Sequence, residues 1–221
     1  AAASVLVDKL GKVAARKKGP RDLVTEADLE AQRAVEDVVR AAFPEHAIVG
    51  EEGPTSGESE HGRAGQPYRW IVDPLDGTTN FVHGVPHFAV SVALEHDGTL
   101  LAGTVLDPIA GECFTAGHGI GARLNDKPLQ TSGVEHMGEA LCAVGFAADV
   151  REDSPDLAAF LRVLPQCQAI RRTGSAALNV AYVAAGRFDA AWAFSTKLWD
   201  IAAGVLLVRE AGGVATSPDG G

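Results

Sequence analysis

The sequence is poor in cysteine, in excess positive charge and in long apolar runs, and each shortage excludes a class of protein. Its 3 cysteines, Cys113, Cys142 and Cys167, contain no CxxC pair, which indicates buried thiols in a reducing cytosol rather than a disulfide framework or a zinc site. The formal net charge of -10 lacks the basic excess that binds nucleic-acid phosphates. No apolar run approaches the about 20 residues of a membrane span, and the start has no signal-peptide layout. We therefore expect a cytoplasmic protein with neither a nucleic-acid nor a membrane partner.

The length of 221 residues and an apolar content of 46% allow one large domain or two lobes that share an interface. Apolar residues recur at helical spacing near the start and again from Thr25 to Phe43, where Pro44 ends the predicted helix. We expect this second helix to bury one apolar stripe: Leu29, Val35, Val38, Val39 and Phe43. Residues 53–67 are rich in Gly, Ser and Pro without an apolar period, which predicts a mobile loop.

Strand-type runs dominate the middle of the chain. Asp97-Gly98 separates two of them and is a strong hairpin signal, and Asn125-Asp126 predicts another turn. From about residue 140 the pattern becomes strand, helix, strand, helix, strand, helix, with Ser154 and Ser175 at N-cap positions. We therefore expect an α+β lobe over residues 1–138 and an α/β lobe over residues 139–221.

The segment WIVDPLDGTTNF at residues 70–81 carries the strongest chemical signal. Its apolar start predicts a buried strand that ends at Asp73, and Pro74 predicts a turn that lets Asp76 face the same cavity. Two close carboxylates repel one another unless they share a proton or hold a cation. Gly77 and the residues after it favour a nearby anion, and oxygen-only ligands favour Mg²⁺. Asp-Pro-x-Asp-Gly is equally good turn chemistry when it is considered alone.

Further acidic residues decide between these readings. Glu51 and Glu52 follow a short predicted strand, and Asp200 begins an amphipathic helix, where a carboxylate is either a cap or a ligand. His83 and His87 are poor candidates for a metal, since Gly84 and Pro86 between them break a helix. Arg171 and Arg172 are read either as phosphate contacts or as salt-bridge residues at a subunit or lobe interface.

Three segments in order, GEEG, WIVDPLDGTTNF and WDIAAGVLLVREAGG, resemble the signatures of the inositol monophosphatase family of Mg²⁺-dependent, Li⁺-sensitive sugar phosphatases. DLVTEAD at 22–28 and GSAALNVAYVAAGRFDAAW at 174–192 extend the resemblance over nearly the whole chain. It implies a layered αβαβα sandwich with a metal site between two lobes, and a homodimer. It also implies that the family fold continues after residue 221 with another strand and helix.

The resemblance further implies a site for two to three Mg²⁺ ions. Its ligands would be four acidic side chains and one carbonyl group: Glu51, Asp73, Leu75, Asp76 and Asp200. Asp73 would bridge two ions, and Glu51 would hold a third through water. Such ions lower the pKa of bound water and neutralise a phosphoryl group, so no protein nucleophile is required.

The resemblance also assigns roles beyond the metal ligands. Thr78, supported by Glu51 and Asp28, would orient the attacking water, which implies direct in-line hydrolysis of a phosphate monoester. The backbone amides of Gly77 and Thr78 would receive phosphate oxygens. Asp76 and Ala176 would contact the substrate.

The identity of the substrate is left open. Ala193 stands where inositol-specific members carry a Glu that contacts a sugar hydroxyl, which argues against inositol 1-phosphate. Other family substrates are fructose 1,6-bisphosphate, histidinol phosphate and nucleotide 3'-phosphates. Lys197 is read either as a solvated lysine or as a contact for a second anionic group. A phosphatase with an aspartyl-phosphate intermediate fits less well because it needs Asp-x-Asp, and a regulatory binding protein on the same fold is the rival outside enzymes.

Overall fold

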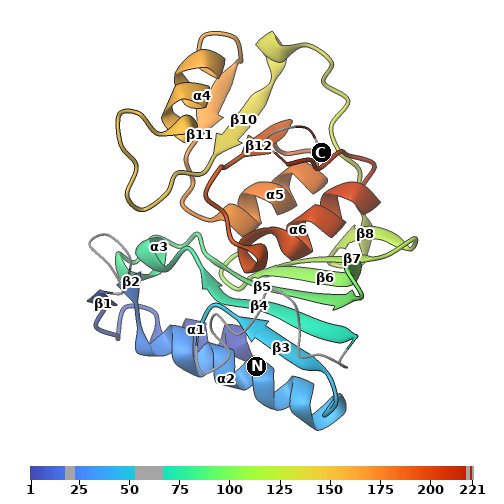
Figure 1. Cartoon of the computed structure of the whole chain (residues 1–221). Helices are drawn as coiled ribbons and strands as arrows, with labels where there is room; N and C mark the ends of the chain where they lie inside the picture. Colours follow the sequence, from blue (N-terminus) through green and yellow to red (C-terminus); the bar gives the residue numbers. More distant parts are fainter. Residues whose placement is uncertain (18–22, 53–66, 218–219, 221) are drawn as a thin grey trace.

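The computed structural model describes every residue except 18–22, 53–66, 218–219 and 221, so the predicted loop at 53–67 lies, apart from Pro67, outside the described residues. Helices and sheets alternate in layers (Figure 1). Helices α1 (Ala2–Lys9) and α2 (Glu26–Ala42) cover one face of a large sheet, and α5 (Ala176–Ala184) and α6 (Leu198–Glu210) cover the other. A small sheet and then α4 (Pro155–Val163) lie beyond α5 and α6. The layers follow the predicted αβαβα order.

Within the described residues, seven strands form the large sheet in the order β3 to β9. β3 (Ala47–Gly50) runs parallel to β4 (Tyr68–Asp76), whereas the later neighbours are antiparallel. The remaining strands are β5 (Ala89–His96), β6 (Thr99–Asp107), β7 (Glu112–Gly117), β8 (Gly121–Leu124) and β9 (Lys127–Pro128). The predicted hairpin is confirmed, since Asp97 and Gly98 both have positive φ, at 46° and 82°, and join β5 to β6.

The strand β4 differs from its prediction at Pro74. It does not turn there but continues to Asp76, with a shift in its pairing to β5 between Asp73 and Asp76. Pairing with β3 ends at Val72, so Pro74, which has no N–H group, removes no ladder hydrogen bond on that side. A pairing irregularity, rather than a turn, therefore separates the two carboxylates.

The predicted buried stripe of α2 is wrong in part. Val39 is buried, but Val38 is 59% exposed and Phe43 is 43% exposed. The buried face consists instead of small or polar residues: Ala27, Asp28, Ala31 and Gln32. Small residues let the helix approach the sheet closely. Because these residues carry little apolar weight, the spacing of the larger apolar residues predicted a buried face that is partly exposed. A short antiparallel ribbon of β1 (Arg16–Lys17) and β2 (Leu23–Val24) precedes the helix.

The second half of the chain alternates as predicted. In the described part, β10 (Leu141–Val144) pairs in parallel with β11 (Ala169–Arg171) and β12 (Ala190–Trp192) to form the small sheet. A 3-10 turn, η1 (Met137–Glu139), connects the two sheets. Parallel neighbours require crossovers, and α4 and α5 supply them.

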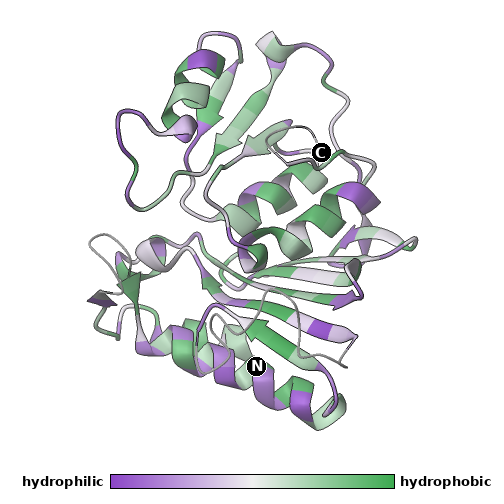
Figure 2. Cartoon of the chain, in the orientation of Figure 1, coloured by the Kyte–Doolittle hydropathy of each residue, from purple (hydrophilic) through white to green (hydrophobic). Residues whose placement is uncertain are grey.

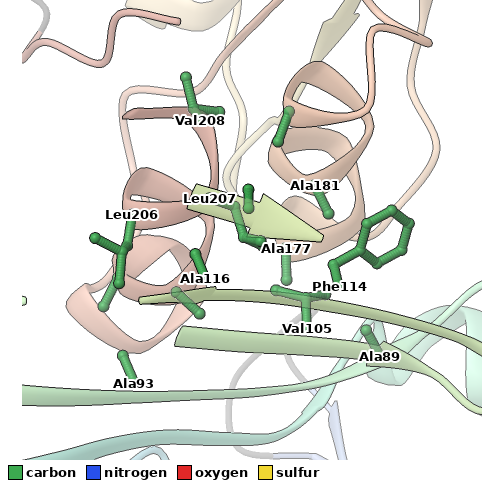
Figure 3. Packing of buried hydrophobic residues seen from close by; sticks show 14 of the residues in the cluster. Ala89, Ala93, Val105, Phe114, Ala116, Ala177, Ala181, Leu206, Leu207 and Val208 are labelled. Atoms are coloured by element: carbon green, nitrogen blue, oxygen red, sulfur yellow. The ribbon is translucent and has the colours of Figure 1, made fainter. Parts of the chain in front are cut away.

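The largest buried cluster joins both parts of the chain. Figure 3 shows Ala177 and Ala181 of α5 and Leu207 of α6 packed over Val105 and Phe114 of the large sheet. Hydrophobic residues accordingly dominate α5 and α6 in Figure 2, whereas polar residues recur along α2. The predicted lobes, residues 1–138 and 139–221, therefore share one hydrophobic core.

The structure bears on the cysteines and on the search for a membrane span. Only Cys142 is a buried thiol; Cys113 and Cys167 are half-buried, and all three are free. No helix in the described part of the chain is long and apolar enough to cross a membrane.

Candidate active site

Adjacent strand ends deliver the first acidic residues. The parallel pairing of β3 and β4 continues one residue past Gly50, since the Glu51 amide donates to the Val72 carbonyl at 3.1 Å. Glu51 and Asp73 therefore leave the same edge of the sheet. On the other side, Ser91 lies opposite Asp73 in β5, and its hydroxyl donates to the Trp199 carbonyl at 3.3 Å. This contact holds the first turn of α6, and with it Asp200, beside the end of β4.

The four carboxylates influence one another electrostatically. Burial raises the pKa of Asp73 well above its usual range, and the negative charges of Glu51, Asp76 and Asp200 raise it further. Burial also raises the pKa of Asp76 to about 6, against three hydrogen bonds that lower it. For Asp200, burial is again the largest cause and raises the pKa to about 7. Segments separated by more than a hundred residues thus bring their acids together, with Asp73 and Asp76 buried and Glu51 and Asp200 half-buried.

Each of the three aspartates also accepts hydrogen bonds. Asp73 accepts one from the Leu75 amide at 3.0 Å, and Asp200 one from the Lys197 amide at 2.7 Å. Among the described residues, no group of three or more His, Cys, Asp or Glu side chains is already arranged to hold a metal ion. The carboxylates are close enough to repel one another. Their donor atoms are all oxygen, and their repulsion is relieved by a cation, so the residues fit Mg²⁺ in chemistry.

Thr78 connects this region to α2. Its hydroxyl lies 3.2 Å from Asp28 Oδ1 and 3.1 Å from the Leu75 carbonyl oxygen. Asp28 is buried, and its other oxygen accepts from the amide and hydroxyl of Thr25 at 2.8 and 2.6 Å. Burial raises the pKa of Asp28, while these Thr25 bonds lower it. The capping box of α2 thus holds the carboxylate against Thr78.

Gly77 occupies a position that requires glycine. Its φ of 94° is left-handed, and a Cβ there would lie 3.2 Å from the His87 carbonyl oxygen and 3.3 Å from that of Gly174. The chain can therefore turn sharply from β4 into α3 (Thr78–Val82).

The start of α5 closes the site from the second half of the chain. Asp76 accepts hydrogen bonds from the Ser175 hydroxyl and, at 3.0 Å each, from the amides of Ala176 and Ala177. The amide of Ala176, a predicted substrate contact, is thus already bound to Asp76. Ser175 was predicted as a helix cap, and it does accept from the Leu178 amide at 3.1 Å. Its bond to Asp76 has no sequence signal, since 99 residues separate the partners.

Asn80 is a positioning residue that sequence reasoning missed. Its amide nitrogen donates to the His87 carbonyl at 2.7 Å and to the Thr173 carbonyl at 2.9 Å. It therefore ties the loop after α3 to the loop before α5. Asn in a polar run beside a glycine reads as turn chemistry, so the bridging role becomes visible only in the tertiary structure.

Two cavities adjoin these residues. One, of about 500 Å³, is lined by Thr78, by the loop after β10 and by Arg172. The other, of about 620 Å³, is mainly apolar and includes Ala176 and Ala193 in its wall. Lys197 is exposed and lines neither of them, which favours the solvated reading of this lysine.

The acidic residues lie at the edge of the large sheet in a layered αβαβα sandwich, and comparison with known proteins identifies the family. The profile of the inositol monophosphatase family matches residues 1–221, so the chain belongs to that family, as its motifs predicted.

Individual relatives carry two kinds of name. "Nus factor SuhB" of Pseudomonas aeruginosa is 46% identical over 213 residues, which cover 95% of this chain and 78% of that protein. "Inositol-1-monophosphatase" of Rhizobium meliloti is 45% identical and is matched over 92% of this chain and 75% of its own length. The crystal structure of the extragenic suppressor protein suhB from Bartonella henselae superposes with a TM-score of 0.89 at 40% identity, covering 100% of this chain and 84% of that one.

Proposed function

We propose that this protein is a Mg²⁺-dependent phosphatase that hydrolyses a small phosphate monoester by direct attack of water. The supporting observation is that strand pairing and the Ser91–Trp199 contact bring Glu51, Asp73 and Asp200 together, so that the neighbouring carboxylates raise the pKa of buried Asp73. A fold has no stability reason to keep such repulsion, because buried like charges are unfavourable without a counter-ion. When bound, Mg²⁺ would neutralise the phosphoryl oxygens and acidify water.

The residues of the chain would divide the remaining work. The ions would be held by four carboxylates and one backbone carbonyl group: Glu51, Asp73, Asp76, Asp200 and Leu75. Thr78, kept in place by Asp28, would orient the attacking water through its hydroxyl. The amides of Gly77 and Thr78 would face phosphate oxygens at the start of α3. A staphylococcal inositol monophosphatase, 25% identical, is described in a LiCl-soaked inhibitory complex, which supports Li⁺ inhibition here as well.

The substrate would be inositol monophosphate or a related sugar or polyol phosphate. Ala193 lies in a mainly apolar cavity wall and has no group that accepts a hydrogen bond from a sugar hydroxyl through its side chain. A relative that is 25% identical is described as an inositol monophosphatase and NADP phosphatase in complex with NADP and Ca²⁺. This observation supports testing substrates larger than inositol phosphate.

A regulatory role is the second candidate, and the relatives named "Nus factor SuhB" favour it. Such a role would operate through contacts with a partner.

The deciding experiment is phosphate release from a panel of inositol, sugar, histidinol, glycerol and nucleotide phosphates, with Mg²⁺, with EDTA and with added Li⁺. Asp73→Asn should lower Mg²⁺-dependent release by roughly 10²-fold or more, because a bridging charge is lost. Asp8→Asn, a change to an exposed aspartate of α1, is the matched control and should retain full activity. Equal release by wild type and Asp73→Asn would refute the catalytic assignment, and trapping of a phosphoenzyme would favour the aspartyl-phosphate mechanism.

A further inference from the structure

The outer helix α4 is anchored by a charged residue. Asp156, in its first turn, is 1% exposed and is the only buried residue among the nine of this helix, all of which the structure describes. Leu161 of the same helix is 60% exposed, and Figure 1 shows α4 on the outer side of the small sheet. A buried carboxylate is unfavourable unless it is hydrogen-bonded, so the partners of Asp156 indicate what it holds.

Both printed partners of Asp156 lie in the loop between β12 and α6. The Phe194 amide donates to Asp156 Oδ1 at 2.8 Å, and the Ser195 hydroxyl donates to Oδ2 at 3.4 Å. A hydrogen bond from a backbone amide to a carboxylate is among the stronger ones in proteins, and the start of a helix favours the negative charge. Asp156 therefore ties the outer helix directly to the backbone of this loop.

The same loop is also held from the end of β10. The Gly145 amide donates to the Trp192 carbonyl at 2.9 Å, and a Cβ on Gly145 would lie 2.8 Å from the Cβ of Ala193. The residue after Gly145 returns to α4, since the rings of Phe146 and Phe160 meet edge to face at 5.9 Å. The helix α4 and the loops after β10 and β12 are thus joined by contacts on three sides.

The loop after β12 lies beside the proposed substrate site. Ala193 and Phe194 line the same cavity as Ala176, and the Ala176 amide donates to Asp76 at 3.0 Å. The part of a phosphate monoester that does not react has to lie next to the carboxylates that hold the ions. The cavity begins at a direct partner of Asp76, so its wall at residues 193–194 is in place to contact that part of the substrate.

We propose that Asp156 is a positioning residue that sets the substrate preference, because it holds residues 193–195 against the alcohol part of the phosphate monoester without touching the substrate itself. This inference rests on the proposed phosphatase function and adds how the site selects an alcohol. A displacement on the order of 1 Å in such a wall changes rates by up to ~10²-fold. Loss of the anchor affects different alcohols unequally, whereas loss of folded protein lowers phosphate release from all of them by the same factor.

The test measures kcat/KM of wild type and Asp156→Ala for inositol, sugar, histidinol, glycerol and nucleotide phosphates under saturating Mg²⁺. The change caused by Asp156→Ala should differ by about 5-fold or more between the most and the least affected substrate, mainly through KM. Asp156→Asn keeps an oxygen that accepts from the Phe194 amide, so its values should stay within about 2-fold of wild type. The rise in melting temperature that Mg²⁺ causes should be the same in all three proteins.

Asp153→Ala is the matched control, since this aspartate is exposed just before α4, and it should keep the wild-type preference. Circular dichroism verifies folding; if Asp156→Ala is unfolded, Ser195→Ala removes one partner and should cause a smaller change that is again unequal between substrates.

A uniform change over all substrates, or no change, would overturn the inference and leave the phosphatase assignment intact. A smaller effect of Mg²⁺ on the melting temperature without a change in preference would also overturn it, because the loop would then serve to place Asp200. Release from none of the compounds by wild type would count against the phosphatase assignment and this inference together.

Discussion

Asp73 shows how one buried charge can oppose the stability of the fold that contains it. It is 1% exposed, and the neighbouring negative charges and its burial raise its pKa well above its usual range. Asn keeps the oxygen that accepts from the Leu75 amide but removes the charge. We expect Asp73→Asn to raise the unfolding free energy of the metal-free protein by about 1 kcal/mol or more, as measured by urea denaturation in EDTA.

The control for this stability effect is again Asp8→Asn, whose change should remain within about 0.5 kcal/mol because the side chain is exposed. A lower midpoint for Asp73→Asn than for wild type in EDTA would show that its charge is stabilised within the fold and that the repulsion is absent. Added Mg²⁺ should reverse the order of the two proteins, since only wild type then has the full set of ligands.

The titration of Asp76 and Asp200 predicts a pH dependence. Their native pKa values are raised to about 6 and about 7, so the native state retains protons that the unfolded chain has released from about pH 4 upward. The unfolding free energy of the metal-free protein should therefore decrease as the pH rises from about 4 to about 7.5, and then level off. Thermal denaturation in EDTA across this range measures the slope. A rise in stability over the same interval would contradict the raised values.

Among the secondary-structure elements, the start of α5 has the most consequential cap. Ser175 both accepts from the Leu178 amide and donates to Asp76. We expect Ser175→Ala to lower the unfolding free energy by about 1–2 kcal/mol, because it removes a cap and leaves a buried carboxylate with one donor fewer. It should also lower activity, since Asp76 loses part of its support.

Ser154 provides the comparison for that prediction. It occupies the N-cap position of α4, but its side chain makes no capping bond and accepts from the Arg151 amide instead. Ser154→Ala should therefore cost less than Ser175→Ala in the same urea titration. Equal losses would mean that the bond to Asp76 contributes nothing to stability.

Local signals predicted most elements but not their faces. Alternating β-type runs and the Asp97-Gly98 turn were sufficient for the hairpin of β5 and β6, because turn chemistry is local. In α2, by contrast, the buried face depends on small and polar residues such as Ala31 and Gln32, which no apolar period marks. The turn predicted at Pro74 was also wrong, because the effect of a proline on a strand depends on whether a neighbouring strand pairs with it at that position.

For the whole molecule, the layer of α5 and α6 is the structural link. The two helices pack on the large sheet, and in the chain α5 lies between β11 and β12 of the small sheet while α6 follows β12. We expect the two sheets to unfold together. Trp70 of β4 and Trp192 of β12 report on them separately once the other tryptophans are replaced by Phe, and their fluorescence midpoints in urea should coincide. Two separate midpoints would instead support independent lobes divided near residue 138.

Taken alone, the sequence determined the elements, the family and the identity of the acidic residues, because these depend on local patterns and on short motifs. Only the tertiary structure decided that Glu51, Asp73, Asp76 and Asp200 influence one another, since strand pairing and helix packing bring distant segments together. It also decided that Ser175 supports Asp76 and that Arg172, not Lys197, lines the cavity beside Thr78. Some of these contacts join residues more than a hundred positions apart, and no local propensity encodes them.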